Sequence, residues 1–500
     1  MITSRYIKYY QLIILLCFNL AIQGQSSSVL GTGQWVKLAV NNKGIYKIDF
    51  ETMQKAGFDP SSVNADNIQL YGQAGGMLPQ PNSAPRPNDL VQNAVYAVGL
   101  EDQSFDPTDY LLFFSEGPNL ERINVDGHLV YEKNLYADTA YYFLSVATSA
   151  GKRMEIQPNM GTDYPEINHY IDYRYQEPDL QNILSSGRFW FGPLVTSSSR
   201  VAVDFDNVPP LSAGSNLEII ASVLNRSQES SNFSFTLNGT GIGSIATNGI
   251  GSGTYDDKGV LGLDTMRIAA SQITQNGSLA FDVRYEGGGN GLFDYLQVSY
   301  TSPLEFNGSP LYFRSIESLQ HGHSTFSISS ASEQAVVWEV TDAQDVAIQE
   351  YSIIDNSLAF GAETNELKEY VVFSGDNFPV PLEVIPVDNQ DLHGNPVPDL
   401  LIVTHPNFKS AAERLATFRS QHDQLEVLVV TPEEIYNEFS SGRQDISAIR
   451  DFARFMHLKD QKLKYLLLFG RSSYDYKNIT SRNTNYVPTY QSRNSLDPIY

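Results

Sequence analysis

Apolar and polar residues alternate in short runs along most of this chain, and clusters of Gly, Asn, Ser and Pro separate the runs. Apolar side chains at every second position predict half-buried strands, and short strands at regular spacing are typical of β-sandwiches and related all-β folds. The pattern holds over residues 34–146 and 155–302, and a third, smaller segment of the same kind follows over 306–387. We therefore expect a series of all-β domains.

The first β segment opens with two alternating runs, residues 35–40 and 45–50, on either side of a polar turn that ends in Gly44. Two such runs around a glycine turn predict a β-hairpin. Residues 51–56 fit one short helix. Further strands are expected at 67–71, 109–114 and 141–146.

The second β segment predicts a β-sandwich or jelly roll. Its strands are expected at 201–205, 217–221, 233–237, 279–283 and 295–300. Tyr170, Tyr173 and the run Arg188-Phe189-Trp190 are candidates for an aromatic surface that binds sugars or partners. Rings of this size more commonly fill a core, and we take that as the default role. The third segment has its clearest strands at 335–340 and 370–373.

A proline-rich linker leads into the terminal segment, where the pattern changes. Residues 389–394 in this linker are polar and are expected on the surface. Beyond Pro398, residues 399–404, 425–430 and 463–469 are apolar runs without alternation. Such runs are typical of strands that are buried on both faces of a parallel sheet.

Helical patterns lie between these three runs. Residues 409–422 have apolar side chains at helical spacing. Thr431 precedes Pro432 and Glu434, which predicts a capped helix start, and Asp445 predicts a second cap. Strands that alternate with helices predict a parallel sheet with right-handed crossovers.

The carboxyl ends of parallel strands are where ligands and chemistry are found. His405 follows the first strand of this segment, but Pro406 comes directly after it, and we interpret it as a loop histidine. Asp475 and Asp497 are candidates for ligating a hard cation or orienting a base, although turn-stabilising roles are commoner for such residues. No dinucleotide or Walker loop and no serine elbow is present. We assign no catalytic, cofactor-binding or metal-binding residue.

Length and charge exclude several classes of protein. A chain of 500 residues exceeds one hydrophobic core, so we expect three or four domains. The formal net charge is −24, and binding to a nucleic-acid backbone requires many Lys and Arg residues. We therefore expect no nucleic-acid partner.

The N-terminus predicts a secretory signal peptide over residues 1–24. Arg5 and Lys8 precede a short apolar run over 12–18, and small residues follow near a cleavage site at Gln25. A buried helix or a lipid-attached Cys17 are the alternatives. Cys17 is the only cysteine, so the mature chain is expected to have no thiol, no disulfide and no cysteine nucleophile.

Several motifs resemble the gingipain-type cysteine peptidases of family C25, and most closely the sortases of that family that serve the Bacteroidetes type IX secretion system. In the terminal segment they are 466–470 (LLLFG), 473–478 (SYDYKN), 485–491 (NYVPTYQ) and 494–498 (NSLDP). In the first β segment, 44–48 (GIYKI), 71–79 (YGQAGGMLP) and 109–114 (DYLLFF) support the resemblance.

The resemblance implies a caspase-like α/β peptidase domain with a His–Cys dyad. It implies cleavage of the C-terminal sorting signal of secreted cargo, surface lipopolysaccharide as an acceptor, and contact with outer-membrane components of the secretion system. It places the protein at the outer membrane on the cell surface. The Gly-His-Gly-like motif of the family is not found, and Arg471 stands where the family usually has an acidic residue. We therefore transfer no catalytic residue and no cofactor.

These observations predict a signal peptide (1–24), a β-rich domain (25–154), a sandwich-like domain (155–302), a small β domain with a linker (303–397) and an incomplete peptidase domain (398–500). The expected function is that of the N-terminal part of a sortase whose dyad lies outside this chain. One alternative is an exported, non-catalytic β-rich adaptor with a degenerate peptidase remnant. Another is a glycan-binding module in the middle β domain.

Overall fold

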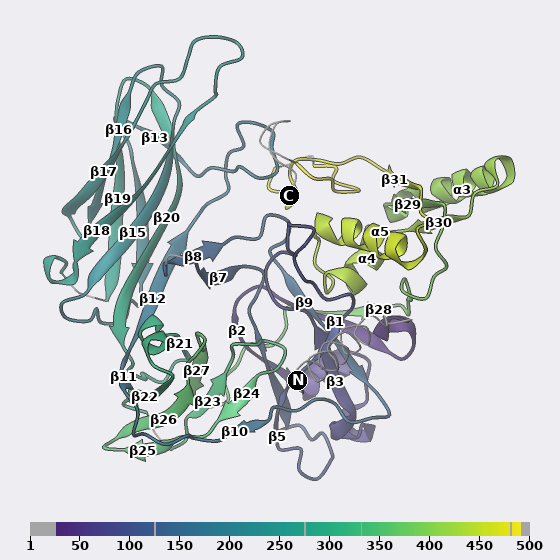
Figure 1. The fold of residues 1–500 in the computed structure, drawn as a ribbon, viewed down its shortest axis with the longest axis horizontal. Coiled ribbons are helices and arrows are strands. Elements are labelled where there is room, and N and C mark those ends of the chain that lie inside the picture. The colour runs from purple at the N-terminus through teal and green to yellow at the C-terminus, as the bar shows by residue number, and fades with distance from the viewer. Residues whose placement is uncertain (1–26, 125–126, 275–276, 332, 481–482, 492–500) are drawn as a thin grey trace, which may run out of the picture.

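The computed structural model describes residues 27–124, 127–274, 277–331, 333–480 and 483–491. Sheets fill most of the molecule, and the longer helices gather in its C-terminal part (Figure 1). All-β units followed by an α/β unit with a parallel sheet confirm the predicted fold class. The predicted signal segment, Cys17 and Asp497 lie outside the described residues. Within the described ranges, no helix has the length and apolar character needed to cross a membrane.

Two packed sheets form the N-terminal β unit. The first has the order β28 (Glu383–Val387), β1 (Trp35–Val40), β9 (Ala140–Val146), β3 (Ile68–Gly72) and β4 (Val91–Asn93). The second has the order β2 (Gly44–Asp49), β6 (Tyr110–Ser115) and β5 (Tyr96–Val98). Helix α2 (Phe50–Lys55) follows β2, and the Asp49 side chain caps it by accepting a hydrogen bond from the Thr52 N–H. Apolar side chains from both sheets share one core.

The predicted hairpin over residues 35–50 is wrong. Strand β1 pairs with β28 and β9, whereas β2 pairs with β6 in the other sheet. Every residue of β1 is buried, so it is an interior strand with a neighbour on each side. The turn at 41–43 therefore carries the chain from one sheet to the other.

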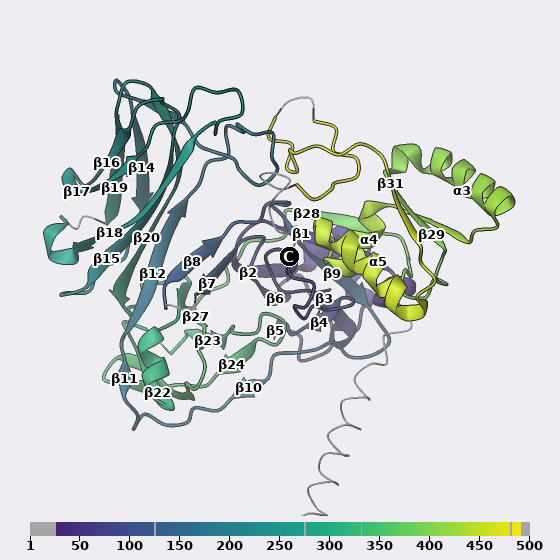
Figure 2. The same ribbon diagram turned by 45° about the horizontal axis from the view of Figure 1, so that its top comes forward.

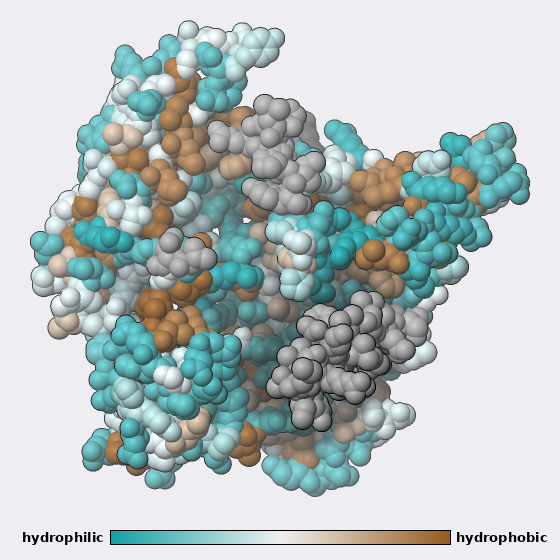
Figure 3. Space-filling model, viewed as in Figure 1, coloured by the Kyte–Doolittle hydropathy of each residue, from teal (hydrophilic) through white to brown (hydrophobic). Residues whose placement is uncertain are grey.

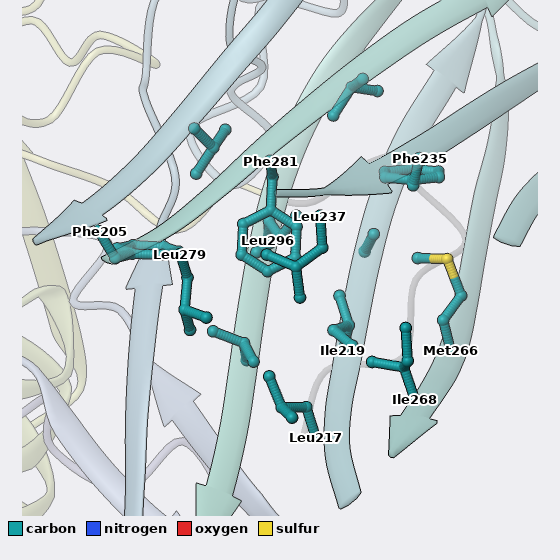
Figure 4. Packing of buried hydrophobic residues seen from close by; sticks show 14 of the residues in the cluster. Phe205, Leu217, Ile219, Phe235, Leu237, Met266, Ile268, Leu279, Phe281 and Leu296 are labelled. Carbon is teal, nitrogen blue, oxygen red and sulfur yellow. The ribbon is translucent and has the colours of Figure 1, made fainter. Parts of the chain in front are cut away.

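The middle β unit is a sandwich. One sheet has the order β12 (His169–Gln176), β20 (Asn290–Pro303), β15 (Asn216–Asn225) and β18 (Val260–Ala269), with β13 (Leu194–Thr196) also paired to β20. The other has the order β14 (Arg200–Asp206), β19 (Ser278–Glu286), β16 (Ser231–Leu237) and β17 (Thr240–Thr247). Buried and less buried residues alternate along β14 and β16, and the inward side chains interdigitate, as Phe281, Leu296 and Ile219 show in Figure 4.

A third β unit lies beside the first two. One of its sheets has the order β10 (Ile156–Gln157), β24 (Ala347–Gln349), β23 (Val336–Glu339), β27 (Tyr370–Phe373) and β21 (Leu311–Phe313). The other has the order β11 (Glu166–Ile167), β22 (His323–Ser329), β26 (Ser357–Glu363) and β25 (Ser352–Ile354). A separate hairpin joins β7 (Leu120–Ile123) and β8 (Leu129–Glu132). The domain boundaries at 154, 302 and 397 stay predictions, and the pairings of β28 with β1 and of β10 with β24 join residues across them.

The α/β unit is a three-stranded parallel sheet with helices on both faces (Figure 2). The strands are ordered β30 (Val427–Val430), β29 (Leu400–Thr404), β31 (Tyr465–Phe469). The helices are α3 (Lys409–Asp423), α4 (Pro432–Phe439) and α5 (Ile446–Asp460). Leu401 and Val403 of β29 pack with α4 and α5, whereas Leu400 and Ile402 pack towards α3. All elements predicted for this unit are present within a few residues.

Candidate functional site

The carboxyl edge of the parallel sheet is where the fold would support chemistry. Val403 lies opposite Val430, and Thr404 lies opposite Phe469, so the three strands end together. The Thr404 hydroxyl donates a 3.0 Å hydrogen bond to the Phe469 carbonyl, which ties β29 to β31 at this edge. The residues after each strand therefore meet in one region.

The helices near this edge begin where the sequence predicts. Thr431 and Glu434 form a capping box: the Glu434 N–H donates to the Thr431 hydroxyl, and the Thr431 N–H donates to the Glu434 carboxylate at 2.6 Å. Asp445 caps α5 by accepting from the Ser447 N–H at 2.7 Å, and it also accepts from the Leu78 N–H at 2.8 Å. Burial raises the pKa of Asp445 to about 6, against the lowering effect of these hydrogen bonds.

His405 occupies a structural position in the loop after β29. It is the N-terminal cap of a short 3₁₀ turn, and its Nδ1 accepts a 3.2 Å hydrogen bond from the Asn407 N–H. Its ring lies 4.9 Å from the ring of Tyr486. A catalytic base must reach a nucleophile at hydrogen-bond distance, and no side-chain nucleophile contacts His405 among the described residues. The geometry agrees with its interpretation as a loop histidine.

Asp475 is fully buried and organises the loop after β31. One carboxylate oxygen accepts from the Ile479 N–H at 2.9 Å, and the other accepts from the Thr480 N–H and hydroxyl, both at 2.7 Å. Both oxygens are thus used within the loop, as expected for a turn-stabilising aspartate. The described ranges contain no group of three or more His, Cys, Asp and Glu side chains that could hold a metal ion.

Residues 471–480 and 483–490, which follow β31, fold back over the sheet edge. The Tyr486 N–H donates a 2.8 Å hydrogen bond to the Arg471 carbonyl, and Val487 packs so tightly on Gly470 that a Cβ there would lie 2.8 Å from a Val487 methyl carbon. Tyr486 stands between His405 and Phe408. The carboxyl edge is therefore covered by the chain's own loop.

The same loop joins the α/β unit to the N-terminal β unit and to the sandwich. Tyr476 packs edge-to-face on Tyr136 at 5.0 Å, and a Cβ at Gly187 would lie 2.2 Å from the Tyr476 ring. Arg188 donates a 2.6 Å hydrogen bond to the Tyr490 hydroxyl, and Trp190 contacts Tyr474 at 6.1 Å. Arg188 and Trp190 are thus used in packing against the C-terminal loop, whereas Phe189 packs against Phe191, Leu224 and Leu292 of the sandwich. Nothing in the sequence near Arg188 and Trp190 indicates that they lie beside the C-terminal loop.

A buried ion pair lies beneath α4, in the segment that the sequence places on the surface. His393 Nδ1 lies 2.5 Å from Glu438 Oε2, and both side chains are fully buried. His393 Nε2 lies 2.8 Å from the Asn88 carbonyl, and the imidazole stacks on Phe439 at 4.9 Å. The prediction that residues 389–394 lie on the surface is therefore wrong for Leu392 and His393, because their polar and apolar partners come from distant segments.

Burial alone would lower the pKa of His393. The hydrogen bond with Glu438 and the negative charges of Asp89 and Glu438 act in the opposite direction and hold the pKa above the ordinary histidine value. A protonated imidazole donates to both the carboxylate and the Asn88 carbonyl, so this charge state satisfies both acceptors. The pair therefore links the loop before β4 to helix α4.

The proline-rich loop of the N-terminal β unit is held on α5 by a second buried pair. Arg86 lies 2.6 Å from Asp451, and both side chains are almost completely buried. Arg450 donates to the Gln80 carbonyl at 2.6 Å and to the Pro79 carbonyl at 2.9 Å. The α/β unit is thus fixed to the N-terminal β unit by the Arg86–Asp451 ion pair and by the hydrogen bonds of Arg450.

One edge of the described sheet is apolar and exposed. Among the described residues, β31 has a strand partner on one side only, and Tyr465 is 55% exposed. Leu466 next to it is also exposed, and apolar surface is visible around this sheet and α3 in Figure 3. An exposed apolar edge strand is a surface that pairs readily with a further strand.

Comparison with known proteins identifies a family for the terminal segment and a fold for the whole chain. Residues 393–500 match the model of peptidase family C25. The crystal structure of dimeric latent PorU from Porphyromonas gingivalis superposes with a TM-score of 0.82 at 23% identity, covering 95% of this chain and 45% of that chain. The chain therefore shares the fold of the part of PorU that it matches, and it spans less than half the length of that protein.

Other matches are partial. A CBM36-1 domain of a xylanase from the hindgut metagenome of Trinervitermes trinervoides covers 26% of this chain and 96% of its own, at 12% identity and a TM-score of 0.16. A β-porphyranase from Bacteroides plebeius covers 54% of this chain and 35% of its own, at 11% identity and a TM-score of 0.18. These TM-scores carry no argument about function. No curated protein sequence matches the chain.

Proposed function

Starting from the PorU fold and the C25 match, we propose that this chain provides the β domains and the first part of the peptidase domain of a type IX secretion system sortase. Its reaction is cysteine-type cleavage of the C-terminal sorting signal of secreted cargo. The observation that carries the proposal is the agreement of two independent comparisons. The family match covers the α/β unit, and the fold match covers both this unit and the β units that precede it.

The geometry of the α/β unit is consistent with a scaffold for chemistry supplied from elsewhere in the same sheet. His405 and Asp475 are engaged in loop contacts, and Cys17 is the only cysteine of the chain and belongs to the predicted signal peptide. The exposed apolar edge at β31 suits the addition of further strands. We therefore propose that the nucleophile and base come from strands that would extend the sheet beyond β31.

Two assays test this proposal. Purified residues 25–500 should not cleave a peptide that carries a cargo C-terminal signal. Cleavage that iodoacetamide abolishes would contradict the proposal that this chain lacks the catalytic dyad. In cells, disruption of the gene should leave secreted cargo with its C-terminal signal attached. Normal cargo processing in the disrupted strain would refute the sortase function itself.

The proposed location follows from the proposed reaction. We place the protein at the outer membrane on the cell surface, with secreted cargo and outer-membrane secretion components as partners and surface lipopolysaccharide as the acceptor. Digestion of intact cells with an added protease should remove the protein. Full protection in intact cells, with digestion after lysis, would contradict the surface location.

A non-catalytic docking role is the second candidate, and one observation favours it. Residues 471–480 and 483–490 cover the carboxyl edge of the sheet, and Tyr476 among them packs on Gly187 and Tyr136 of the β units. A sheet edge that is covered by such a loop would function in contact between the α/β unit and the β units. Reading the gene beyond the Tyr500 codon separates the two: a Gly-His-Gly-like motif and a later cysteine favour the sortase, and a stop codon favours docking.

A further inference from the structure

A cavity of about 640 Å³ lies where the three β units meet. Its wall is formed by β12 of the sandwich, β21 of the third β unit and the β7–β8 hairpin, which converge in Figure 1. Small-molecule sites typically occupy about 300–1,000 Å³ and favour junctions between domains. The position and size of this cavity therefore fit a binding site.

Tyrosine rings form one side of the cavity. Tyr131 of β8 stacks on Tyr175 of β12 with centroids 4.1 Å apart, and it lies 6.3 Å from the ring of Tyr173. Tyr170 and Tyr312 also line the cavity. The rings come from three different elements, so packing of the units fixes their relative positions.

Paired charges form the floor. Arg314 lies 2.6 Å from Glu121 and also pairs with Glu369, and Lys43 lies 2.9 Å from Glu121. Burial alone would raise the pKa of Glu121, but Lys43 and Arg314 outweigh this effect and lower it to about 2. Each of these cations therefore faces a carboxylate that is ionised at neutral pH. The floor therefore offers hydrogen-bonding groups in fixed positions. Among its described residues, it has no unpaired charge that would attract an ionic ligand.

One polar group in the wall has no protein partner. Tyr170 is 4% exposed and lines the cavity. Within the described ranges its hydroxyl makes no hydrogen bond. Because Tyr170 lines the cavity, a ligand there can supply the partner that this hydroxyl lacks.

The edge of β12 that faces the cavity is blocked against strand addition. The Tyr173 N–H donates a 2.8 Å hydrogen bond to the Asp172 carboxylate, and the Tyr173 carbonyl accepts one of 2.7 Å from Arg174. The Ile171 N–H already donates to the Arg314 carbonyl. An extended peptide that binds by β-augmentation needs these main-chain groups free. The edge therefore disfavours a peptide and favours a ligand that side chains recognise.

From these features we propose that the cavity binds a neutral oligosaccharide. The apolar C–H faces of sugar rings pack on aromatic side chains such as the tyrosines that line this cavity, and sugar hydroxyls hydrogen-bond with paired carboxylates, guanidinium groups and the Tyr170 hydroxyl. An anionic or cationic ligand would have to compete with existing ion pairs such as Arg314–Glu121. This inference does not depend on the peptidase proposal.

The test is titration of purified residues 25–500 with maltohexaose, cellohexaose, xylohexaose and mannohexaose, followed by saturation-transfer NMR and calorimetry. At least one hexaose should bind with a Kd of about 1 mM or lower. Tyr131→Ala should weaken that binding about tenfold, because it removes an aromatic ring that lines the cavity and supports Tyr175. Tyr255→Ala is the matched control, since Tyr255 is fully exposed and does not line the cavity.

Tyr170→Phe keeps the ring and removes only the free hydroxyl, so it tests the site even if Tyr131→Ala perturbs folding. It should weaken binding of the same hexaose several-fold. Absence of binding by all four saccharides at about 10 mM, ten times the expected Kd, would overturn the proposal. Equal affinity in wild-type, Tyr131→Ala and Tyr170→Phe chains would overturn it too, as would selective binding of a tyrosine- and proline-containing peptide in place of the sugars.

Discussion

Replacing His393 by alanine should loosen helix α4 from the N-terminal β unit. The imidazole connects the Glu438 carboxylate at 2.5 Å and the Asn88 carbonyl at 2.8 Å, and it stacks on Phe439. Glu438 is fully buried and also accepts hydrogen bonds from the Gln390 side chain and the Leu392 N–H, both at 2.8 Å. Removing His393 therefore leaves a buried carboxylate without its charged partner.

The expected cost is large because the charge is enclosed. Breaking a buried ion pair by removing one partner costs about 3–5 kcal/mol. Expressed as an opening equilibrium, this corresponds to a rise of about 100- to 5,000-fold in the exchange rate of amides that open with this unit. The removed ring also leaves space beside Phe439, which adds to the cost.

Hydrogen exchange followed by mass spectrometry measures this effect in peptides from α4 and from residues 383–400. His422→Ala is the matched control, because His422 is exposed and pairs with Asp423 on the helix surface. The double variant His393→Leu with Glu438→Leu replaces both charges by apolar groups. It should restore part of the protection that His393→Ala removes, although it leaves the Leu392 N–H without its acceptor.

The effect should also depend on pH. The folded pKa of His393 is raised above its ordinary value, so its stabilising contribution is complete below about pH 6.5 and is lost as pH rises through the folded pKa. The difference in α4 protection between wild type and His393→Ala should therefore shrink as the pH rises above about 6.5. Unchanged exchange in His393→Ala, or an equal effect of His422→Ala, would refute the reasoning.

Three further predictions follow from buried groups at other places. Asp475→Ala should cost about 1–3 kcal/mol for each buried donor that it leaves unpaired, seen as a lower thermal midpoint and faster proteolysis within 471–491; an unchanged midpoint would contradict this. Gly187→Ala should cost about 1–3 kcal/mol by forcing a Cβ against Tyr476, whereas Gly241→Ala, with open space around it, serves as the control in the same thermal assay. Burial raises the pKa of Asp294 to about 7, so its ionisation should weaken the folded state as pH rises from about 4 to about 7, and Asp294→Asn should flatten this part of the stability profile; a profile identical to wild type would contradict it.

Local chemistry made the α/β unit predictable. Thr431 with Glu434 and Asp445 form caps whose partners lie within three residues, so their sequence spacing is enough to place the helix starts. The apolar run of β29 likewise carries its own evidence, because both faces of a parallel strand are buried. The resemblance of the terminal motifs to family C25 pointed to the same segment that the family model matches.

Non-local contacts explain the predictions that failed. The runs at 35–40 and 45–50 look like a hairpin because they alternate on either side of a glycine turn. The prediction failed because one partner of β1 is β28, which lies at the far end of the β units in sequence. His393 stands in a polar segment, and its burial depends on Asn88 and Glu438, neither of which the local pattern indicates. The residue pattern within a short segment shows how polar the segment is, but it does not show which distant residues pack on it.

The candidate site shows the same division. The roles of His405 and Asp475 follow from their immediate neighbours, and the sequence supported turn and loop functions for both. The loop that closes the sheet edge packs through Tyr476 on Gly187, which lies in a distant part of the sequence. The cavity near Tyr131 is built by three units and has no single motif to mark it.

The place of β28 in the first sheet has a consequence for how the protein is made. Strand β1 forms from residues 35–40, but its neighbour β28 comes from residues 383–387. At synthesis rates of about 5–20 residues per second, roughly 20–70 s separate the appearance of these two strands. During that time one side of β1 has unpaired main-chain groups, which makes the nascent N-terminal unit prone to aggregation. We expect the chain to need a chaperone or an unfolded, export-competent state until β28 closes the sheet.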